Sequence, residues 1–253
     1  MAAFDYNQSN INALESTLSV ERFRTYVQLA GGNRRRAVDI YERNTAISEA
    51  LYGVMQATEV ALRNAIHRAM TDGYGSMWFE APSLALEPPQ LEKLGKAKSE
   101  IQRDKRPLTP GAIVAELGLG FWTSLLASGY EKRLWVPHLH KAFPHAKALR
   151  RNQDGSDTVI RLSRPQIFDQ LDRIRTLRNR IAHHEPIVKM DLPKLYSGAL
   201  DALSWICPIS ESWVRATNCF NARFHAKPLS YEPPKIAVPI NPRPGMPGIV
   251  SKA

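Results

Sequence analysis

The sequence predicts an all-α protein: a helical bundle with additional short helices, no more than a minor hairpin, and an extended Pro-rich C-terminal tail. Apolar residues recur at spacings of three and four, which is the period of an amphipathic helix, and no segment alternates convincingly as a half-buried strand does. Seven of the 18 prolines fall in the last 26 residues, and proline prevents regular helix there. We therefore predict a helical domain over 1–225 and an extended tail over 226–253.

Helix signals are strongest in two segments. The first runs without proline from about Arg34 to Asp72, and Asn44 and Thr45 are predicted to cap a break within it. The second begins near Pro165, where proline suits a first helical turn, and should end before Pro186. The recurring positions are Leu51, Val54, Thr58, Leu62, Ala65 and Ala69 in the first segment, and Ile167, Leu171, Ile174, Leu177 and Ile181 in the second.

Shorter elements are predicted in the rest of the chain. Apolar spacing and flanking glycines or prolines indicate helices over 20–30, 89–106, 192–206 and 209–220, and short helices between 112 and 143. Residues 81–89 and 152–157 are predicted to be loops, because the first contains three prolines and the second is polar.

Composition and charge limit the possible functions. Hydrophobic residues make up 43% of the 253 residues, but no apolar run approaches the roughly 18 residues of a membrane-spanning helix. The N-terminus has no basic start followed by an apolar stretch, so we expect no secretory signal, no membrane partner and a cytoplasmic protein. The formal net charge of +10 favours a polyanionic partner such as nucleic acid; the alternative is a merely basic surface.

Several common catalytic motifs are absent from the sequence. It has no phosphate-binding loop, dinucleotide fingerprint, HExxH motif or GxSxG elbow. Cys207 and Cys219 are too few for a disulfide framework or a four-cysteine zinc site, and packing is their expected role. His138, His140 and His145 lie in a proline-broken segment without a nearby cysteine. We therefore predict no metal and no nucleotide or other cofactor.

The most informative segment is LRNRIAHHEP, residues 177–186. On an ideal helix Arg178 lies about 20° from Leu171, inside the apolar stripe, so it should either pair with a carboxylate or line a cleft. Asn179 and His183 are four residues apart and share a face, whereas His183 lies about 140° from Arg178. A distorted helix end, or a site built from two chains, would let Arg178 and His183 contact one ligand.

A purely structural interpretation also accounts for these residues. Arg178 could form an internal ion pair, and Asn179 could bond to a neighbouring backbone. His183 and His184 could be surface residues that interact with the dipole at the helix C-terminus.

A second segment, 59–67, repeats the Leu-Arg-Asn core of the first. Glu59, Arg63 and His67 are spaced by four and form a polar strip beside the apolar face. They could be an exposed ladder of weak pairs, each about 0.3–0.5 kcal/mol. Alternatively, Glu59 is the carboxylate partner of Arg178, and Arg63 is an additional phosphate contact.

Arg178 and Asn179, three further residues and His183 form an Arg-polar-x3-His pattern. Other blocks surround it in a fixed order: RFRTYV at 22–27, the segment 39–66, YGSMWF at 74–79, GFW at 120–122 and LSWICP at 203–208. These blocks are spread over most of the chain, between residues 22 and 208, and together they resemble the Abi-like, abortive-infection branch of the HEPN superfamily. The tail after Phe224 lies outside the resemblance.

The resemblance implies a HEPN-like helical bundle that acts as a metal-independent endoribonuclease of the toxin or abortive-infection type, often dimeric, in bacterial anti-phage defence. Arg178, Asn179 and His183 would be catalytic; Glu59, Arg63, Asn64, His67, Arg180 and His184 would bind RNA or support the site. This chemistry suits the residues, because RNA supplies its own 2′-hydroxyl nucleophile. Histidine moves a proton near neutral pH, and a guanidinium stabilises charge on the phosphorane.

The expected partners are RNA, as target or as a structured regulatory RNA, and a second copy of the chain. The runner-up is a non-catalytic RNA-binding or regulatory HEPN-fold protein, and the third interpretation is a helical protein–protein adaptor. Three basic segments could follow a phosphate backbone or be solvated helix faces: 34–36, 93–106, and 141–182, which has ten Lys or Arg against four Asp.

Overall fold

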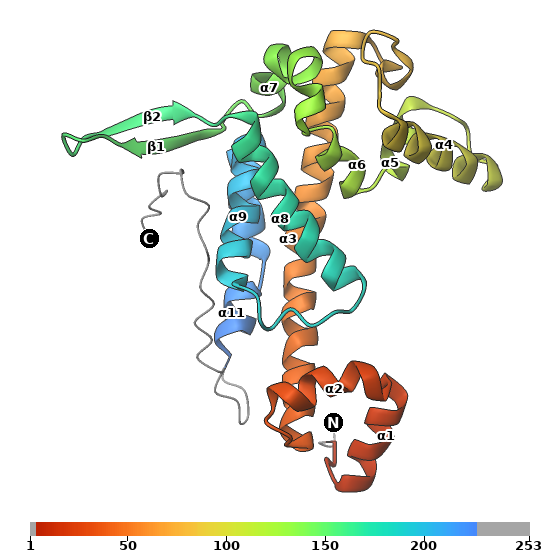
Figure 1. Ribbon diagram of the computed structural model, residues 1–253, viewed down its shortest axis with the longest axis vertical. Coiled ribbons are helices and arrows are strands. Elements are labelled where there is room, and N and C mark those ends of the chain that lie inside the picture. Colours follow the sequence, from red (N-terminus) through yellow and green to blue (C-terminus); the bar gives the residue numbers. More distant parts are fainter. Residues whose placement is uncertain (1–3, 227–253) are drawn as a thin grey trace.

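The computed structural model describes residues 4–226, and their fold is predominantly helical (Figure 1). These residues form eleven α-helices, three short turns of 3-10 or π-helix and one two-stranded antiparallel hairpin. The prediction of a mostly helical protein with no more than a minor hairpin is confirmed. The predicted tail, 226–253, lies outside the described residues except for Ala226.

One helix, α3 (Arg34–Tyr74), forms the axis of the molecule (Figure 1). It runs unbroken for 41 residues, so the predicted break at Asn44 and Thr45 is wrong. Asn44 is buried, and its Oδ1 accepts a hydrogen bond of 2.8 Å from the backbone N–H of Ile187. Asparagine is common at helix ends, but here the Asn44 side chain accepts the backbone N–H of Ile187, in the loop after residue 182.

Two helices, α1 (Gln8–Leu18) and α2 (Val20–Leu29), pack at the N-terminal end of α3 (Figure 1). The α2 helix confirms the prediction for 20–30, and the Ser19 hydroxyl accepts the Arg22 N–H, as expected of a cap. The α1 helix was not predicted. These helices share a small core of their own with α3, formed by Ile11, Phe23, Tyr26, Ala30, Ala37, Val38 and Ile40.

Short helices surround the C-terminal half of α3 (Figure 1). They are α4 (Pro88–Arg103), α5 (Pro110–Glu116), α6 (Leu119–Ser124) and α7 (Val136–Ala142), with turns at Trp78–Glu80, Ser128–Tyr130 and Glu131–Trp135. Three fully or nearly fully buried aromatic rings, Trp78, Phe121 and Trp122, contact one another there. In the apolar segment between Ala112 and Phe143, α6 and α7 pack against α3, whereas α5 packs against α4, so its pieces form several short helices rather than one.

The hairpin consists of β1 (Lys147–Arg151) and β2 (Asp157–Arg161), which project from the helical body (Figure 1). The predicted loop at 152–157 contains its turn, with Gly155 at φ 83°, but the two strands were not predicted. Most of their residues are exposed on both faces, including Leu149 and Val159. A strand without a buried face has no need of the apolar alternation by which strands are found in a sequence.

The remaining helices are α8 (Arg164–Ala182), α9 (Leu192–Ile206), α10 (Pro208–Thr217) and α11 (Phe220–His225). The predicted end of the helix over 209–220 is therefore wrong, because α10 ends at Thr217, with Asn218 as its C-cap, and α11 begins at Phe220. The Asn218 amide nitrogen donates to the Ala50 carbonyl, and its oxygen accepts the Phe220 N–H. Helices α8 and α9 pack together and against α3 over the main core. None of the helices within 4–226 is both long and apolar enough to cross a membrane.

Asn44→Ala should lower the free energy of unfolding by about 1–3 kcal/mol, because the buried Ile187 N–H loses its acceptor. Equilibrium urea unfolding measures this loss. Thr45→Ala is the matched control, since Thr45 is exposed on the same helix and should change stability by less than about 0.5 kcal/mol. Equal stability of both variants would contradict the assigned role of Asn44.

Candidate functional site

Helix α8 presents the predicted motif. It starts with a capping box between Ser163 and Gln166, and Ile167, Leu171, Ile174 and Leu177 are fully buried along one face. This apolar stripe confirms the predicted spacing and fixes the rotation of α8. Residues 178–183 therefore leave the core at a defined position, at the C-terminal end of the helix.

The end of α8 has the geometry of a Schellman motif. The His184 N–H donates to the Ile181 carbonyl at 3.0 Å, and the Glu185 N–H donates to the Arg180 carbonyl at 2.8 Å. His184 occupies the left-handed position with φ 55°, where glycine is usual. Its carbonyl also accepts a bond of 3.3 Å from the Arg22 guanidinium. The backbone that carries both histidines is thus fixed.

The predicted ion pair between Arg178 and Glu59 is present. Arg178 Nε lies 3.3 Å from Glu59 Oε2, and the Leu119 N–H donates to Glu59 Oε1 at 2.9 Å. Glu59 on α3 thereby joins α8 and the first turn of α6. Glu59 Oε1 is occupied by the Leu119 N–H, so Glu59 contacts the Arg178 guanidinium through Oε2 at Nε.

Arg178 is less buried than the helical wheel predicted. Its side chain is 38% exposed, and that of Glu59 is 19% exposed. Solvent screens a half-exposed pair, so we expect this pair to contribute little to stability. The reason for the exposure is position: Leu177 ends the fully buried stripe, and the next turn, with Ile181, lies at the rim of the core.

Arg178 and Arg63 border a common cavity of about 440 Å³ between α3 and α8. It is lined by Tyr52, Met55, Gln56, Glu59, Val60, Arg63, Arg178, Ile181 and Ala182. Arg63 Nε is buried and has no hydrogen-bond partner among the described residues. Two guanidinium groups therefore border this space with one carboxylate, Glu59. Such an excess of positive charge suits a phosphate or another anion.

Two polar side chains of this cavity, Tyr52 and Gln56, were not predicted as site residues. Both belong to α3, where positions 52, 56, 59 and 63 follow at intervals of four, three and four and so share a face. Tyr52 is 61% exposed. An exposed aromatic ring beside an anion-binding space offers a surface on which a nucleic-acid base can stack.

His183 and Asn179 do not line the cavity. His183 is the exposed C-cap of α8, and its N–H donates to the Asn179 carbonyl at 2.9 Å. This is a backbone bond; the part of the chain that the structure describes has no bond between the two side chains. Within one chain, Arg178 and His183 thus belong to one helix end but not to one cavity, as the wheel predicted.

The other predicted residues lie in three different places. Asn64 lines a second cavity of about 700 Å³, between α3 and α10. Arg180 contacts the adjacent loop, with Nε 3.6 Å from Glu185. The ring of His67 accepts a bond of 2.9 Å from the Trp78 indole at Nδ1, which gives it a structural role. Of the six predicted supporting residues, only Glu59 and Arg63 share a cavity with Arg178.

Burial, aided by the neighbouring Arg68, lowers the pKa of His67 below its usual 6.5. Since the unfolded chain takes up this proton first, the contribution to stability is complete above about pH 6.5 and is lost as pH falls. His67→Gln keeps an acceptor for Trp78. It should therefore make the fall in melting temperature from about pH 7.5 to about pH 5.5 shallower. His145→Gln, at an exposed histidine, is the matched control and should not make that fall shallower.

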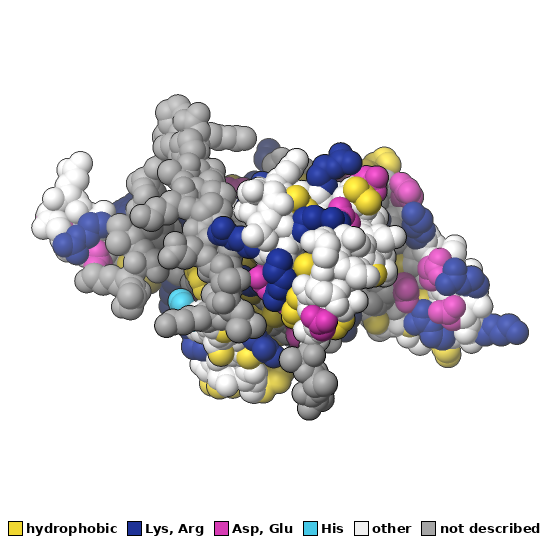
Figure 2. Space-filling model, turned by 90° about the horizontal axis from the view of Figure 1, so that it is seen from below, with side chains coloured by type: hydrophobic (Ala, Val, Ile, Leu, Met, Phe, Trp, Pro, Cys, Tyr) yellow, Lys and Arg dark blue, Asp and Glu magenta, His cyan; other side chains and the backbone are white. Residues whose placement is uncertain are grey.

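No other chemistry is evident within 4–226. The described residues contain no group of three or more His, Cys, Asp or Glu side chains that could hold a metal ion. Lys and Arg side chains are spread over the face seen in Figure 2 and interspersed with acids, with no single basic patch. Net charge alone thus does not locate a partner surface on this face.

Comparison with protein-family models, with curated proteins and with solved structures finds no match for this chain. A functional assignment therefore depends on the geometry and chemistry of its own residues.

Proposed function

We propose that this protein is a metal-independent endoribonuclease of the abortive-infection type, with a HEPN-like fold, that acts in the cytoplasm in defence against phage. The observation that carries the proposal is the pair of guanidinium groups on one cavity, with Arg178 held by Glu59 and Arg63 Nε without a hydrogen-bond partner within 4–226. His183 stands at the end of the same helix, exposed to solvent and free to meet a substrate.

The reaction needs only these groups and the RNA itself. The 2′-hydroxyl attacks the adjacent phosphorus, and His183 takes the proton that this hydroxyl loses. The bond to the 5′-oxygen breaks, and this oxygen receives a proton from the imidazolium so formed or from the His183 of a second copy. Negative charge grows on the phosphorane oxygens, where the Arg178 guanidinium stabilises it. The Asn179 amide can donate to a phosphate oxygen. The products are a 2′,3′-cyclic phosphate and a 5′-hydroxyl.

Two copies of the chain would complete the site. Arg178 and His183 diverge within one chain, and the outer face of α3 and α10 carries exposed apolar side chains, namely Tyr52, Ile209 and Trp213. Gln56 and Val60 border both the 440 Å³ and the 700 Å³ cavities, so this face is continuous. A twofold contact there would bring both copies of the motif around one phosphate.

The direct test is incubation of RNA with the wild-type protein in EDTA, followed by mapping of the product ends. We expect cleavage, with 2′,3′-cyclic phosphate and 5′-hydroxyl ends. Ends of 3′-hydroxyl and 5′-phosphate, or no cleavage of any RNA tested, would contradict the proposal.

The dimeric site is tested by mixing two inactive variants, Arg178→Ala and His183→Ala, under conditions that allow subunit exchange. A mixed dimer carries one intact Arg178 and one intact His183, so activity should reappear. A mixture that stays inactive, or a monomeric protein that cleaves at the full rate, would exclude a shared cleft.

One observation favours the alternative, a non-catalytic RNA-binding or regulatory protein on the same fold. Asn179 does not orient His183 through its side chain, and His183 lies outside the cavity. Such a protein would bind RNA in a salt-sensitive way but leave it intact in the EDTA experiment.

A further inference from the structure

We propose that the β1–β2 hairpin is an arm that binds the phosphate backbone of double-stranded RNA, at the opposite end of α8 from the motif. The inference rests on the proposed function in taking RNA as the ligand. Its evidence is separate, because it comes from the pairing, charge and exposure of the hairpin residues.

The pairing register brings like charges together. The Leu162 N–H donates to the Ala146 carbonyl, and the Asn152 N–H donates to the Ser156 carbonyl. The pairs Lys147–Arg161, Leu149–Val159 and Arg151–Asp157 therefore occupy the non-hydrogen-bonded positions between them, where facing side chains approach most closely. Two cations directly opposite each other destabilise a hairpin unless an anion lies between or beside them.

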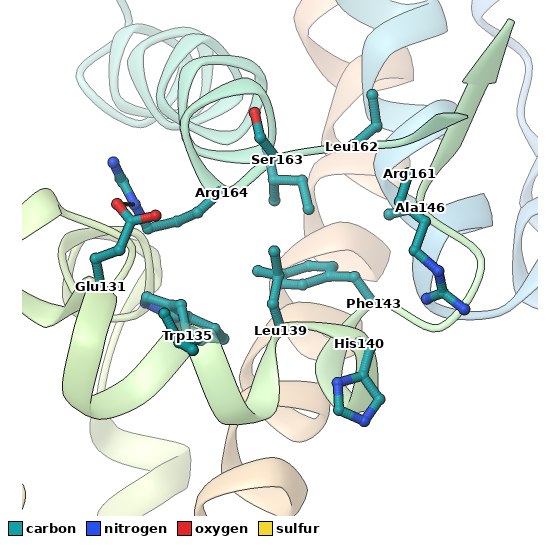
Figure 3. Close-up of a pocket in the computed structure, with 12 residues that line it drawn as sticks. Glu131, Trp135, Leu139, His140, Phe143, Ala146, Arg161, Leu162, Ser163 and Arg164 are labelled. Carbon is teal, nitrogen blue, oxygen red and sulfur yellow. Dashed lines mark hydrogen bonds and ion pairs between the residues drawn. The ribbon is translucent and has the colours of Figure 1, made fainter. Parts of the chain in front are cut away.

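Three of the four hairpin cations are unpaired. Arg151 forms an ion pair with Asp157 at 3.2 Å, whereas Lys147, Arg150 and Arg161 are exposed and have no ion pair within 4–226. Figure 3 shows Arg161 pointing away from the neighbouring Arg164–Glu131 pair, whose carboxylate accepts from Arg164 Nε at 2.7 Å. The nearby acid thus does not neutralise Arg161.

The other two basic segments differ from the hairpin. At the start of α3, Arg34 pairs with Glu15 and Arg35 pairs with Asp39. In and after α4, three of the six cations, Lys98, Arg103 and Arg106, are paired with acids. In the hairpin only one of four cations has such a pair, so the hairpin has the smallest paired fraction of the three groups.

The arm has a fixed root and a free outer part. Ala146 and Leu162 are buried, and Ala148 packs against the main core. Residues 147–161 contain no aromatic side chain, so they offer no ring on which unpaired bases could stack. Exposed cations without aromatic rings suit the backbone of a duplex, which is recognised by shape and phosphate contacts. The 19 residues of α8 span about 28 Å, with the arm at one end and the motif at the other.

The test measures binding of an RNA duplex of about 20 base pairs with 2′-O-methyl riboses, which lacks the nucleophile and cannot be cleaved. The variant Lys147→Gln, Arg150→Gln, Arg161→Gln should bind at least about tenfold more weakly at about 0.1 M salt. Its slope of log affinity against log salt should fall by about two to three. The matched control is Arg24→Gln, Lys96→Gln, Lys105→Gln, which removes the same charge from other exposed positions.

The control should bind within about twofold of wild type, as expected if position rather than net charge matters. Equal affinities of the two triple variants, whether both weak or both strong, would overturn the proposal. A loss of affinity of the hairpin variant for single-stranded RNA of the same sequence, with no loss for the duplex, would also overturn the proposal. So would binding of an acidic protein to the open edge of the hairpin if the hairpin variant still bound the RNA duplex with wild-type affinity. Cleavage is not the readout, so an inactive protein with hairpin-dependent duplex binding would refute only the ribonuclease function.

Discussion

His183→Ala should abolish RNA cleavage, with a rate about 10²–10⁴-fold below wild type, while folding and RNA binding persist. The imidazole is the group beside the Arg178 cavity suited to moving a proton near neutral pH. His183 is exposed, and its side chain has no hydrogen bond or ion pair within 4–226, so its removal should have little effect on stability. Single-turnover cleavage, together with a binding isotherm for uncleavable RNA, separates the two effects.

His184 is the control for this result. It is adjacent, also exposed, and held at φ 55°, a conformation that asparagine tolerates better than most residues. His184→Asn should therefore keep both the fold and most of the activity, and His184→Ala should also retain more activity than His183→Ala. The opposite ranking would assign proton transfer to His184 and contradict the site proposed here.

Arg178→Ala should lower the cleavage rate by about 10²–10³-fold, as expected for loss of one group that stabilises the charged transition state. Its effect on stability should be small, about 1 kcal/mol or less, because the pair with Glu59 is partly exposed. Cleavage kinetics and urea unfolding on the same sample test both parts. A variant that unfolds at low denaturant while keeping its specific activity would give Arg178 a structural role only.

Two further substitutions show whether position or charge matters at Arg178. Arg178→Lys keeps the charge but not the planar fork of donors, so it should remain well below wild-type activity. Glu59→Gln should lower activity less than Arg178→Ala, because the Leu119 N–H still finds an acceptor while Arg178 loses its ionic anchor. Full activity of Arg178→Lys would reduce its role to a point charge.

Helix periodicity made most of the fold predictable. The stripe of α8 and the extent of α9 follow directly from apolar spacing, because these helices bury one face against α3. The hairpin could not be found in this way, since neither of its faces is fully buried. The continuity of α3 through Asn44 was also out of reach, because the partner of that side chain is Ile187, which is 143 positions away.

The candidate site was predictable in its chemistry and less so in its surroundings. An arginine within an apolar stripe predicted a carboxylate partner, and Glu59 fills that role. The degree of exposure could not be read from a wheel, because it depends on where the neighbouring helices end. Asn64 and His67 share the sequence pattern of Arg63, yet they face α10 and Trp78 instead.

The two bonds that hold the loop after α8 also affect when the protein can become active during its synthesis. Arg22 reaches the His184 carbonyl across 162 positions, and Asn44 reaches Ile187 across 143. A ribosome must therefore produce about three-quarters of the chain before either contact can close. Before that point, α2 and α3 lack the loop that they bind, and the motif that precedes this loop has not been synthesised. On the proposed function, a nascent chain would therefore lack nuclease activity until at least about three-quarters of these residues have been synthesised.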